Sequence, residues 1–355
     1  MRAPWLLALV AGGCIIDAPI GEPRDDDRDG FAVGEDCDDT DPDVNPEAVE
    51  VCDAVDNDCN DAVDDQHVCD RTVSFRQAST LDVLLVIDDS SSMLEFQERM
   101  ADGLAELLAP ITGLDADTHV GVVTMDMDDP LASGRLRSYA GERWIASNTP
   151  AEEVAVWTDG VLLAGEAGSG TEAGVDAAIA ALTTHRLGAN DGFRRLGAHL
   201  TVIALTSEAD QSAATLDDAL DALSSVASSF TWHAIVPTGD LGCMDGLVAQ
   251  KHVDLATLTG GTSRSICTPE FGGFLDAIGQ ISAQEGLQRR FLLPGTAEPG
   301  SVQVDVVLPT SNTVRPLDPD EINLSSDATE VVLVNPPPAG SAITIRYRHL
   351  PPRIP

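Results

Sequence analysis

Residues 81–93, "LDVLLVIDDSSSM", decide the fold class, because a mainly apolar run here gives way to a polar loop. The run at 81–87 has the length and composition of a strand that is buried on both faces. Three more runs of this kind follow, "HVGVVTM" (119–125), "HLTVIAL" (199–205) and "WHAIVP" (232–237). Strands buried on both faces are typical of a parallel sheet that is covered by helices. The four runs therefore predict a parallel sheet.

Segments with helical periodicity separate these strands. Their apolar residues recur every three or four positions, in three groups: Met93, Phe96, Met100, Leu104 and Leu107; Val175, Ile179 and Leu182; Leu216, Leu220, Leu223 and Val226. A later helix is expected to pack inward through Phe271, Leu275, Ile278 and Ile281. Strands that alternate with helices predict an α/β fold with a doubly wound, mostly parallel sheet over residues 81–290. In such folds, ligands bind at the carboxyl ends of the strands.

The polar loop at the end of the first strand carries a DxSxS pattern, formed by Asp88, Ser90 and Ser92. A second loop, "GSGTEAG", precedes a helix and contains Thr171. In this strand-helix context the two loops resemble those of the von Willebrand factor A family, and the resemblance extends over residues 81–290. It implies a metal-ion-dependent adhesion site at these residues. Hydroxyl and carboxylate oxygens suit Mg²⁺, Ca²⁺ or Mn²⁺, and in the family an acidic side chain of a protein partner completes the shell of the ion.

One position departs from the family pattern. In "ALTSEADQS" (204–212), Ser207 stands where the family usually has an aspartate. Glu208 or Asp210 could take over as a metal ligand, and Asp89 in the first loop could contribute in part. Alternatively, the site is weak or lost, and the domain is then a structural scaffold in which calcium binds only to the N-terminal module.

A serine nucleophile in the first loop is a rival interpretation. It needs a general base near Ser90 or Ser92, and the seven histidines show no spacing that indicates one. The chain also lacks HExxH, GxSxG and Gly-Lys phosphate-loop motifs. A helix N-cap at Ser90 or Ser91 is compatible with metal binding. We therefore expect a binding protein and not an enzyme, with a hydrolase as the less favoured alternative.

The acidic stretch at residues 25–70 has a pattern of its own. "DDDRDGFAVGED" (25–36) places its key residues at the spacing of an EF-hand-like calcium loop: Asp25, Asp27 and Asp29 at alternate positions, then Gly30, then Asp36 at position twelve. Alternate carboxylates can point at one cation, and the glycine allows the sharp turn. An acidic, solvated spacer is the alternative interpretation.

The rest of this stretch, "EDCDDTDPDVNPEAVEVCDAVDNDCNDAVDD" (35–65), resembles an acidic, cysteine-containing MopE-like metal-binding motif of bacterial surface proteins. Within it, "DNDCN" offers Asp56 and Asp58 at alternate positions as a second calcium loop. A module with so few apolar residues cannot bury a core, so disulfides and calcium are expected to hold it together.

Six of the seven cysteines are expected to form disulfides: Cys37, Cys52, Cys59, Cys69, Cys243 and Cys267. The first four would form two bonds, in any of three pairings, and the last two would form one. A zinc site is not expected, because the first four lack the CxxC pairs that such sites use.

The first residues, "MRAPWLLALVAGGC" (1–14), resemble a bacterial lipoprotein signal. Residues 1–13 would be removed, and Cys14 would carry the lipid that anchors the protein to a membrane. Ordinary secretion with a free Cys14 is the alternative. Because Ile15 and not aspartate follows the cysteine, the resemblance favours the bacterial outer membrane, on its periplasmic or its outer surface. Residues 14–24 and 71–80 are expected to be linkers.

The tail at residues 291–355 changes to a period of two, which predicts a small antiparallel β unit. Its alternating residues are Val302, Val304 and Val306, followed by Ile343, Ile345 and Tyr347.

Charge limits the partners. The chain has 59 acidic and 20 basic residues and a formal net charge of −39, so it repels nucleic acid. The sequence thus predicts an exported, lipid-anchored adhesion protein with Ca²⁺ in the N-terminal module and a divalent ion at the adhesion site.

Overall fold

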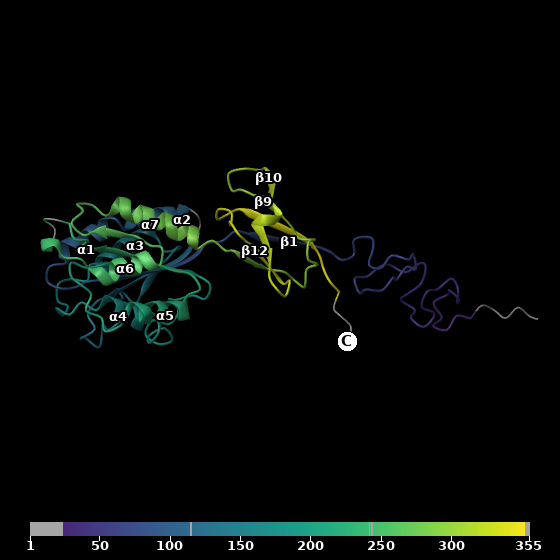
Figure 1. Cartoon of the computed structure of the whole chain (residues 1–355), viewed down its shortest axis with the longest axis horizontal. Coiled ribbons are helices and arrows are strands. Elements are labelled where there is room, and N and C mark those ends of the chain that lie inside the picture. The colour runs from purple at the N-terminus through teal and green to yellow at the C-terminus, as the bar shows by residue number, and fades with distance from the viewer. Residues whose placement is uncertain (1–23, 114–115, 241, 243, 352–355) are drawn as a thin grey trace, which may run out of the picture. The chain divides into compact units, whose positions relative to one another are not determined.

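A six-stranded sheet forms the centre of the α/β fold (Figure 1). The computed structural model describes residues 24–113, 116–240, 242 and 244–351. The strands of this sheet are β2 (Thr80–Ile87), β3 (Asp117–Thr124), β4 (Trp144–Ala146), β5 (His199–Leu205), β6 (Phe230–Val236) and β7 (Ser263–Ser265). They lie in the order β4-β3-β2-β5-β6-β7. β4 pairs antiparallel with β3, and the other pairs are parallel. The predicted doubly wound, mostly parallel sheet is confirmed.

The chain reverses its direction of winding between β2 and β5, which are neighbours in the sheet. The strands from β2 to β4 build one half of the sheet, and those from β5 to β7 build the other. A doubly wound sheet binds ligands at such a point, because the loops that leave the two central strands diverge there and open a crevice.

The helices of this fold are α1 (Leu94–Asp102), α2 (Leu104–Gly113), α3 (Ala151–Trp157), α4 (Gly174–Leu182), α5 (Leu216–Val226), α6 (Gln250–Leu258) and α7 (Gly272–Glu285). A π-helical turn, η1 (Thr158–Leu162), directly continues α3, and a 3-10 turn, η2 (Met244–Gly246), precedes α6. Figure 1 shows α2 and α7 on one side of the sheet and α4 and α5 on the other.

The two faces of the sheet belong to two separate cores. Leu85 and Ile87 of β2 pack with residues of α1, α2 and α7. Leu84 and Val86 of the same strand pack with residues of α4, α5 and α6. Because both faces are covered, β2 reads as a nearly continuous apolar run instead of an alternating one.

Two helix predictions need correction. The expected helix from Met93 to Leu107 is broken at Gly103, where a Cβ atom would lie only 2.7 Å from Leu275 Cδ1 of α7. The close approach of α7 therefore explains why residue 103 is a glycine. Ile281 was expected inside but is 36% exposed, and Ser282 is fully buried in its place. The Ser282 hydroxyl accepts a hydrogen bond from Thr201 Oγ1 at 2.8 Å, so a polar residue holds this inward position.

The tail forms two small antiparallel sheets, as the period of two predicts. One has the order β1-β13-β9-β10 and consists of β1 (Asp70–Arg76), β13 (Ala342–Arg348), β9 (Gln303–Val307) and β10 (Val314–Pro316). The other has the order β11-β12-β8 and consists of β11 (Ile322–Leu324), β12 (Glu330–Leu333) and β8 (Arg290–Leu292). A 3-10 turn, η3 (Pro319–Glu321), precedes β11.

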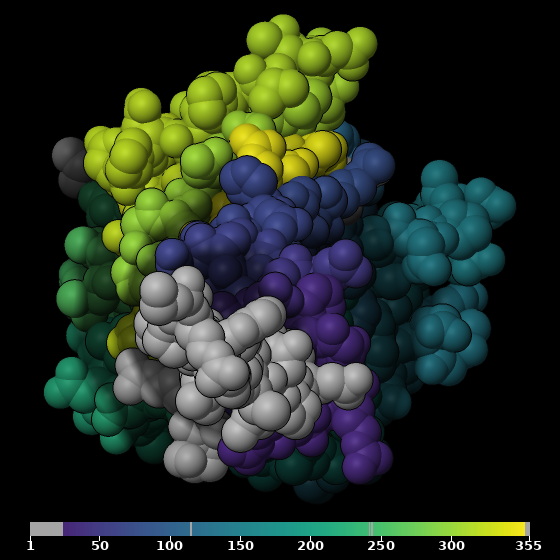
Figure 2. Space-filling model, turned by 90° about the vertical axis from the view of Figure 1, so that its right-hand side faces the viewer, coloured from purple at the N-terminus to yellow at the C-terminus, as the bar shows by residue number. Residues whose placement is uncertain are grey.

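The stretch at 71–80, expected as a linker, contains most of β1. This strand lies beside β13, and Figure 2 shows blue atoms from this part of the chain next to yellow atoms from its C-terminal part. Its side chains alternate between exposed and half-buried positions, as on a sheet with one covered face. The strand is short, and polar residues alternate with its few apolar ones, so a search for continuous apolar runs does not detect it.

The described residues form two compact units. One combines the residues up to Arg71 with Gly295–Ser301 and the residues from Tyr347 onward, and the other contains Thr72–Pro294 and Val302–Arg346. The expected signal peptide and Cys14 lie outside the described residues. Among the residues described, no helix is both long and apolar enough to cross a bilayer.

A buried ion pair fixes the start of β2. Asp82 is fully buried, and its Oδ2 accepts hydrogen bonds from Arg194 Nη1 at 2.8 Å and from the backbone N–H of Arg195 at 2.7 Å. Its Oδ1 accepts from Arg195 Nε at 2.8 Å. One carboxylate inside the central strand thus holds the segment that leads into β5.

We predict that Asp82→Ala lowers the free energy of unfolding by about 3–5 kcal/mol, because it leaves two arginines without their buried partner. Urea denaturation followed by circular dichroism measures this. Asp117→Ala is the matched control. It removes an ion pair to the same Arg195, but Asp117 has a 67% exposed side chain, so the expected cost is about 0–1 kcal/mol. Equal losses in the two variants would contradict the prediction.

Candidate metal sites

Asp88 is held at the carboxyl end of β2, at the point where the winding of the sheet reverses. Its side chain is fully buried. Oδ1 accepts a hydrogen bond from the backbone N–H of Ser90 at 2.8 Å, and Oδ2 accepts one from Thr206 Oγ1 at 2.7 Å. Its own N–H donates to the carbonyl of Leu205 at 2.9 Å. The carboxylate is therefore oriented by the loops of both central strands.

The structure brings the two predicted loops together. The backbone N–H of Gly168 donates to the carbonyl of Asp89 at 2.9 Å, which joins the Thr171 loop to the DxSxS loop. Ser90 is 7% exposed, and its buried Oγ has no hydrogen-bond partner among the described residues. Ser92 and Thr171 are exposed at the same edge. Three hydroxyl side chains thus belong to two joined loops beside Asp88.

The candidates for the missing aspartate lie in different surroundings. Ser207 is 7% exposed, and its Oγ lies 3.3 Å from Ser92 Oγ. Glu208 is half-buried, and its backbone N–H donates to Thr206 Oγ1 at 3.0 Å. From the sequence alone, Glu208 and Asp210 are equivalent candidate ligands, but in the structure the carboxylate of Asp210 pairs with other residues.

Asp210 contacts two helices, α4 and α6. Its Oδ1 lies 3.0 Å from Lys251 Nζ, and its Oδ2 accepts from the backbone N–H of Val175 at 3.0 Å. Burial alone would raise the pKa of Asp210, but His252 and these hydrogen bonds lower it. Its carboxylate therefore pairs with α6 and the start of α4, and Glu208 remains the better candidate ligand.

Glu172 is an acidic residue of this site that the sequence analysis missed. It is 1% exposed, and both of its carboxylate oxygens are buried without a hydrogen-bond partner in the described part of the chain. Burial, together with the negative charges of Asp88, Asp89 and Glu208, raises the pKa of Glu172 to about 9. The sequence feature that points to Glu172 is its position directly after Thr171.

Asp89 adds a second uncompensated oxygen. It is 9% exposed, and its Oδ1 has no partner among the residues described. Burial and the charge of Asp126 raise the pKa of Asp89 to about 6, although Arg137 opposes the shift. A Cβ atom at Gly168 would lie 2.4 Å from this oxygen, so the second loop closes over Asp89 only because residue 168 is glycine.

The loops at this end of the sheet therefore combine hydroxyls with buried carboxylate oxygens that lack partners among the described residues. Leaving such oxygens unpaired costs free energy, and a bound cation removes that cost. Hard oxygen donors of this kind suit Mg²⁺, Ca²⁺ or Mn²⁺. A serine nucleophile gains no support, since no described histidine nitrogen bonds to Ser90 or Ser92. Three buried histidines bond to other groups or stack, namely His199, His233 and His252.

The first acidic loop has the inward carboxylates that its spacing predicts. Ligand oxygens of Asp25, Asp27 and Asp29 lie within 4.8 Å of one another. These three residues are half-buried, whereas Asp26 between them is exposed and pairs with Arg24. One oxygen each of Asp27 and Asp29 is buried without a partner among the described residues.

Asp36 stands at position twelve of this loop, but its ligand oxygen groups with the sulfur atoms of Cys37 and Cys59 and not with the three aspartates. Its Oδ2 is also buried without a partner in the described residues. Partial burial and the charges of Asp29, Asp36 and Asp25 raise the pKa of Asp27. Gly30 has φ of 106°, which supports the sharp turn expected at position six.

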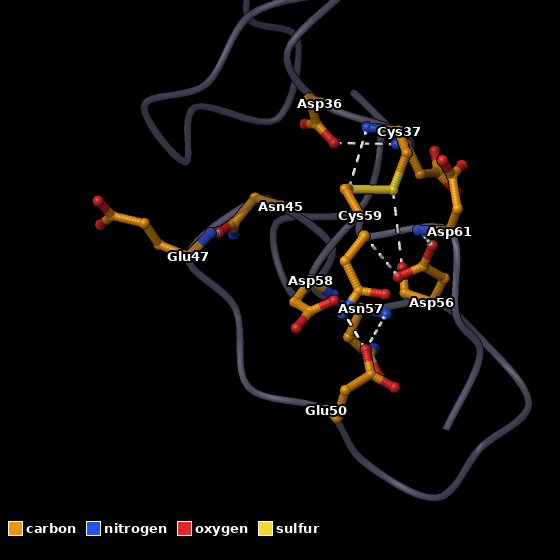
Figure 3. The surroundings of a disulfide bond; sticks show 12 residues. Asp36, Cys37, Asn45, Glu47, Glu50, Asp56, Asn57, Asp58, Cys59 and Asp61 are labelled. Atoms are coloured by element: carbon orange, nitrogen blue, oxygen red, sulfur yellow. Dashed lines mark hydrogen bonds between the residues drawn. A yellow bond between two sulfur atoms is a disulfide. The ribbon is translucent and has the colours of Figure 1, made fainter. Parts of the chain in front are cut away.

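A second group forms around Asp56 and Asp58, and it includes Glu50, which the sequence analysis did not select. Their ligand oxygens lie within 4.8 Å of one another. Glu50 is 2% exposed, and its Oε1 accepts from the backbone N–H groups of Asn57 at 2.6 Å and Asp58 at 3.0 Å (Figure 3). Its Oε2, like Asp58 Oδ1, is buried without a partner among the described residues.

Two disulfides hold the acidic module, and they select one of the three open pairings. Cys37 bonds to Cys59 and Cys52 bonds to Cys69. Cysteines in disulfides offer no thiolate, so oxygen remains the donor in the acidic groups near them. Cys267 is also disulfide-bonded, and its expected partner Cys243 lies outside the described residues.

A family model now matches part of this module. Residues 36–65 match Cu-binding_MopE, described as a putative metal-binding motif. This segment is a MopE-type motif. It contains the Glu50–Asp56–Asp58 group and both cysteines of the Cys37–Cys59 bond, whereas Asp25, Asp27 and Asp29 precede it. No curated protein matches the chain.

Several solved structures are similar to the chain. A von Willebrand factor type A protein from Catenulispora acidiphila is 16% identical, with a TM-score of 0.39, and the match covers 80% of this chain and 66% of that one. The pilus adhesin SpaC from Lactobacillus rhamnosus GG, in an open conformation, is 12% identical, with a TM-score of 0.40 and coverages of 78% and 40%.

Proximal thread matrix protein 1 from the mussel byssus is 16% identical, with a TM-score of 0.39 and coverages of 61% and 50%. The chain spans less than two thirds of the length of each of these structures. At these TM-scores the likeness assigns neither a function nor a partner to this chain.

We predict that Asp27→Asn weakens calcium binding by at least about tenfold, or ~1.4 kcal/mol, because it removes a charged oxygen from the centre of the first loop. Calorimetric titration of the full chain with Ca²⁺ measures this. Asp26→Asn is the control, since it removes the same charge from an exposed neighbour. If the two variants bind Ca²⁺ equally, the loop does not hold the ion in the way its spacing indicates.

Proposed function

We propose that this protein is an exported binding protein whose central domain is of the von Willebrand factor A type. It engages a protein partner through a divalent ion at Asp88, Ser90, Ser92 and Thr171, and an acidic, calcium-dependent module precedes this domain. The observation that carries the proposal is the set of buried oxygens without partners at the switch point of the sheet, on Ser90, Asp89 and Glu172.

The ligand types explain how the site would work. Ser90, Ser92 and Thr171 would offer neutral hydroxyl oxygens, and Asp88 would act directly or through water. Neutral ligands leave an ion electron-poor, so an acidic side chain of the partner can bind to it. The exposure of Ser92 and Thr171 supports access from the outside.

Glu172 would supply the charge that Ser207 does not. Its buried, unpartnered carboxylate is close enough to Asp88 and Glu208 for their charges to raise its pKa. A cation between these groups would favour the ionised form of Glu172. The site would then keep a second anionic ligand despite the serine at position 207.

Calcium is the ion that we propose for the N-terminal module. The name of the matching family refers to copper, but copper sites in proteins favour imidazole or sulfur ligands. Here the four cysteines are in disulfides, and the unpartnered atoms are carboxylate oxygens. Hard oxygen donors at alternate positions fit Ca²⁺.

Export and anchoring remain part of the proposal. The two disulfides of the acidic module suit an oxidising compartment. Cys14 would be the lipid attachment site in the bacterial outer membrane, on either its periplasmic or its outer surface. The acidic module would then form a stalk between the lipid and the binding domain.

We predict that Asp88→Asn removes one bound Mn²⁺ per chain, because the central site loses its buried charge. The stoichiometry of Mn²⁺ binding to the full chain, measured by electron paramagnetic resonance, gives the count. Ca²⁺ binding by the acidic module and the thermal midpoint serve as controls, and neither is expected to change. An unaltered Mn²⁺ count would favour the alternative function, a structural scaffold in which only the acidic module binds metal.

We further predict that Glu172→Gln weakens Mn²⁺ binding at the central site by at least about tenfold, and that Ser207→Asp in the same chain restores it. Glu208→Gln is the matched control and should have a smaller effect, because Glu208 is only half-buried. If Glu172→Gln binds Mn²⁺ normally while Asp88→Asn does not, the metal site stands and the role of Glu172 is wrong.

A further inference from the structure

A cavity of about 610 Å³ lies on the domain away from the residues of the proposed metal site. Its volume falls in the range of pockets that bind small ligands. β4 and α3 provide most of its walls, together with the turn before β4. The lining residues that matter are Tyr139, Glu142, Trp144, Glu152, Glu153 and Trp157.

Tyr139 is held in place as one wall of this cavity. It pairs with Glu142 through two backbone hydrogen bonds of 3.0 and 2.9 Å, and Ala140 and Gly141 between them have φ of 53° and 94°. Two central residues with positive φ make a tight hairpin turn, which is costly for an alanine. The ring is 45% exposed, so it faces solvent although its backbone is fixed.

The ring of Tyr139 rests on the π-helical turn η1. A Cβ atom at Gly160 would lie only 2.2 Å from Tyr139 Cδ2, so the ring occupies the space of a missing side chain. π-helical turns are rare and frequently occur at functional sites. Trp157, just before this turn, lines the cavity and is 3% exposed, and its Nε1 has no hydrogen-bond partner among the described residues.

The charge of the cavity indicates which ligand it fits. Three exposed glutamates line it, Glu142, Glu152 and Glu153, and none of the described lining residues is basic. The ring of Trp144 is already engaged, because Arg143 Cζ lies 5.5 Å from its centroid and the rings of His119 and Phe193 pack against it, so Tyr139 is the aromatic ring available to a ligand. Aromatic rings beside carboxylates bind cations through both the ring faces and the charge.

We propose that this cavity binds an organic cation with an apolar body, either the arginine or lysine side chain of a peptide segment or a free polyamine. The ring of Tyr139 would contact the positive group and the apolar chain next to it, and Glu142, Glu152 and Glu153 would neutralise the charge. The strong negative charge of the whole chain steers cations towards it but does not select a place. The fixed ring of Tyr139 would make this cavity selective. The inference does not depend on the metal site.

Calorimetric titration of the calcium-saturated full chain, at about 0.15 M salt to screen unspecific charge effects, tests the proposal. The probes are N-acetyl-arginine methylamide, spermidine and the neutral N-acetyl-norleucine methylamide. We expect one cationic probe to bind and the neutral probe not to bind. Binding of the arginine probe would identify a peptide segment as the source, and binding of spermidine would identify a polyamine.

Variants separate the cavity from the general negative charge. Tyr139→Ala should weaken binding of the cation about fivefold to tenfold, as expected for the loss of a cation–π contact, whereas Tyr139→Phe should retain it. Glu152→Gln with Glu153→Gln should also weaken it. The matched control is Asp217→Asn with Asp221→Asn, which removes the same charge from exposed positions on α5.

Two results would overturn the proposal. One is that neither cation binds the wild-type chain below about 10 mM. The other is that Tyr139→Ala and the α5 control change the affinity equally, which would assign the binding to net charge alone. Because Tyr139 is nearly half exposed, its replacement should leave the fold intact, and the thermal midpoint checks this.

Discussion

The parallel pairing of β2 with β5 is the constraint on which the central domain depends. The two strands are adjacent in the sheet although more than a hundred residues separate them in the chain, and both faces of each are buried. The loops that leave them must diverge to reach helices on opposite faces. Polar groups at this edge then need partners, and Asp88 supplies them by accepting from the backbone N–H of Ser90 and from the side-chain hydroxyl of Thr206. The pairing of β2 with β5 therefore buries the carboxylate of Asp88 at the carboxyl end of the two strands.

Much of the central fold could be predicted, because burial on both faces leaves a direct mark on the sequence. The apolar runs that became β2, β3, β5 and β6 could not be exposed to water without cost. The position of the DxSxS loop followed from the end of the first run. Other features depend on contacts between distant residues. The glycine at position 103 is needed where α7 approaches closely, and the buried hydroxyl of Ser282 accepts a hydrogen bond from Thr201.

The candidate site was predictable in its hydroxyls but not in its charges. A motif identifies the ligands that a family shares. It does not identify a residue elsewhere in the chain that could replace a ligand absent from the motif. Glu172 follows Thr171 in the chain, yet only the structure shows that it is buried with both oxygens unpartnered. Asp210 shows the opposite case, since its position in the sequence fitted a ligand and its carboxylate is engaged by Lys251. Glu50 was missed for a similar reason, because it lies outside the alternating pattern that led to Asp56 and Asp58.

The acidic module is built on a different principle from the central domain. It has almost no buried apolar side chains, so the hydrophobic effect contributes little to its stability. Its carboxylates are instead arranged by the backbone: Asp25 accepts from the N–H groups of Arg28 and Gly30, and Asp56 does the same for Asn60 and Asp61.

The Cys37–Cys59 bond then ties these two groups together. Cys37 follows Asp36, the last residue of the first loop, and Cys59 lies directly after Asp58 of the second. In the proposed calcium-bound state, a cation that orders one loop would also restrain the other through this covalent bond. The second cation would then have less chain entropy to overcome. If the module binds metal as proposed, its folding and metal binding would be coupled. In the central domain, by contrast, the sheet already places the proposed ligands before any ion binds.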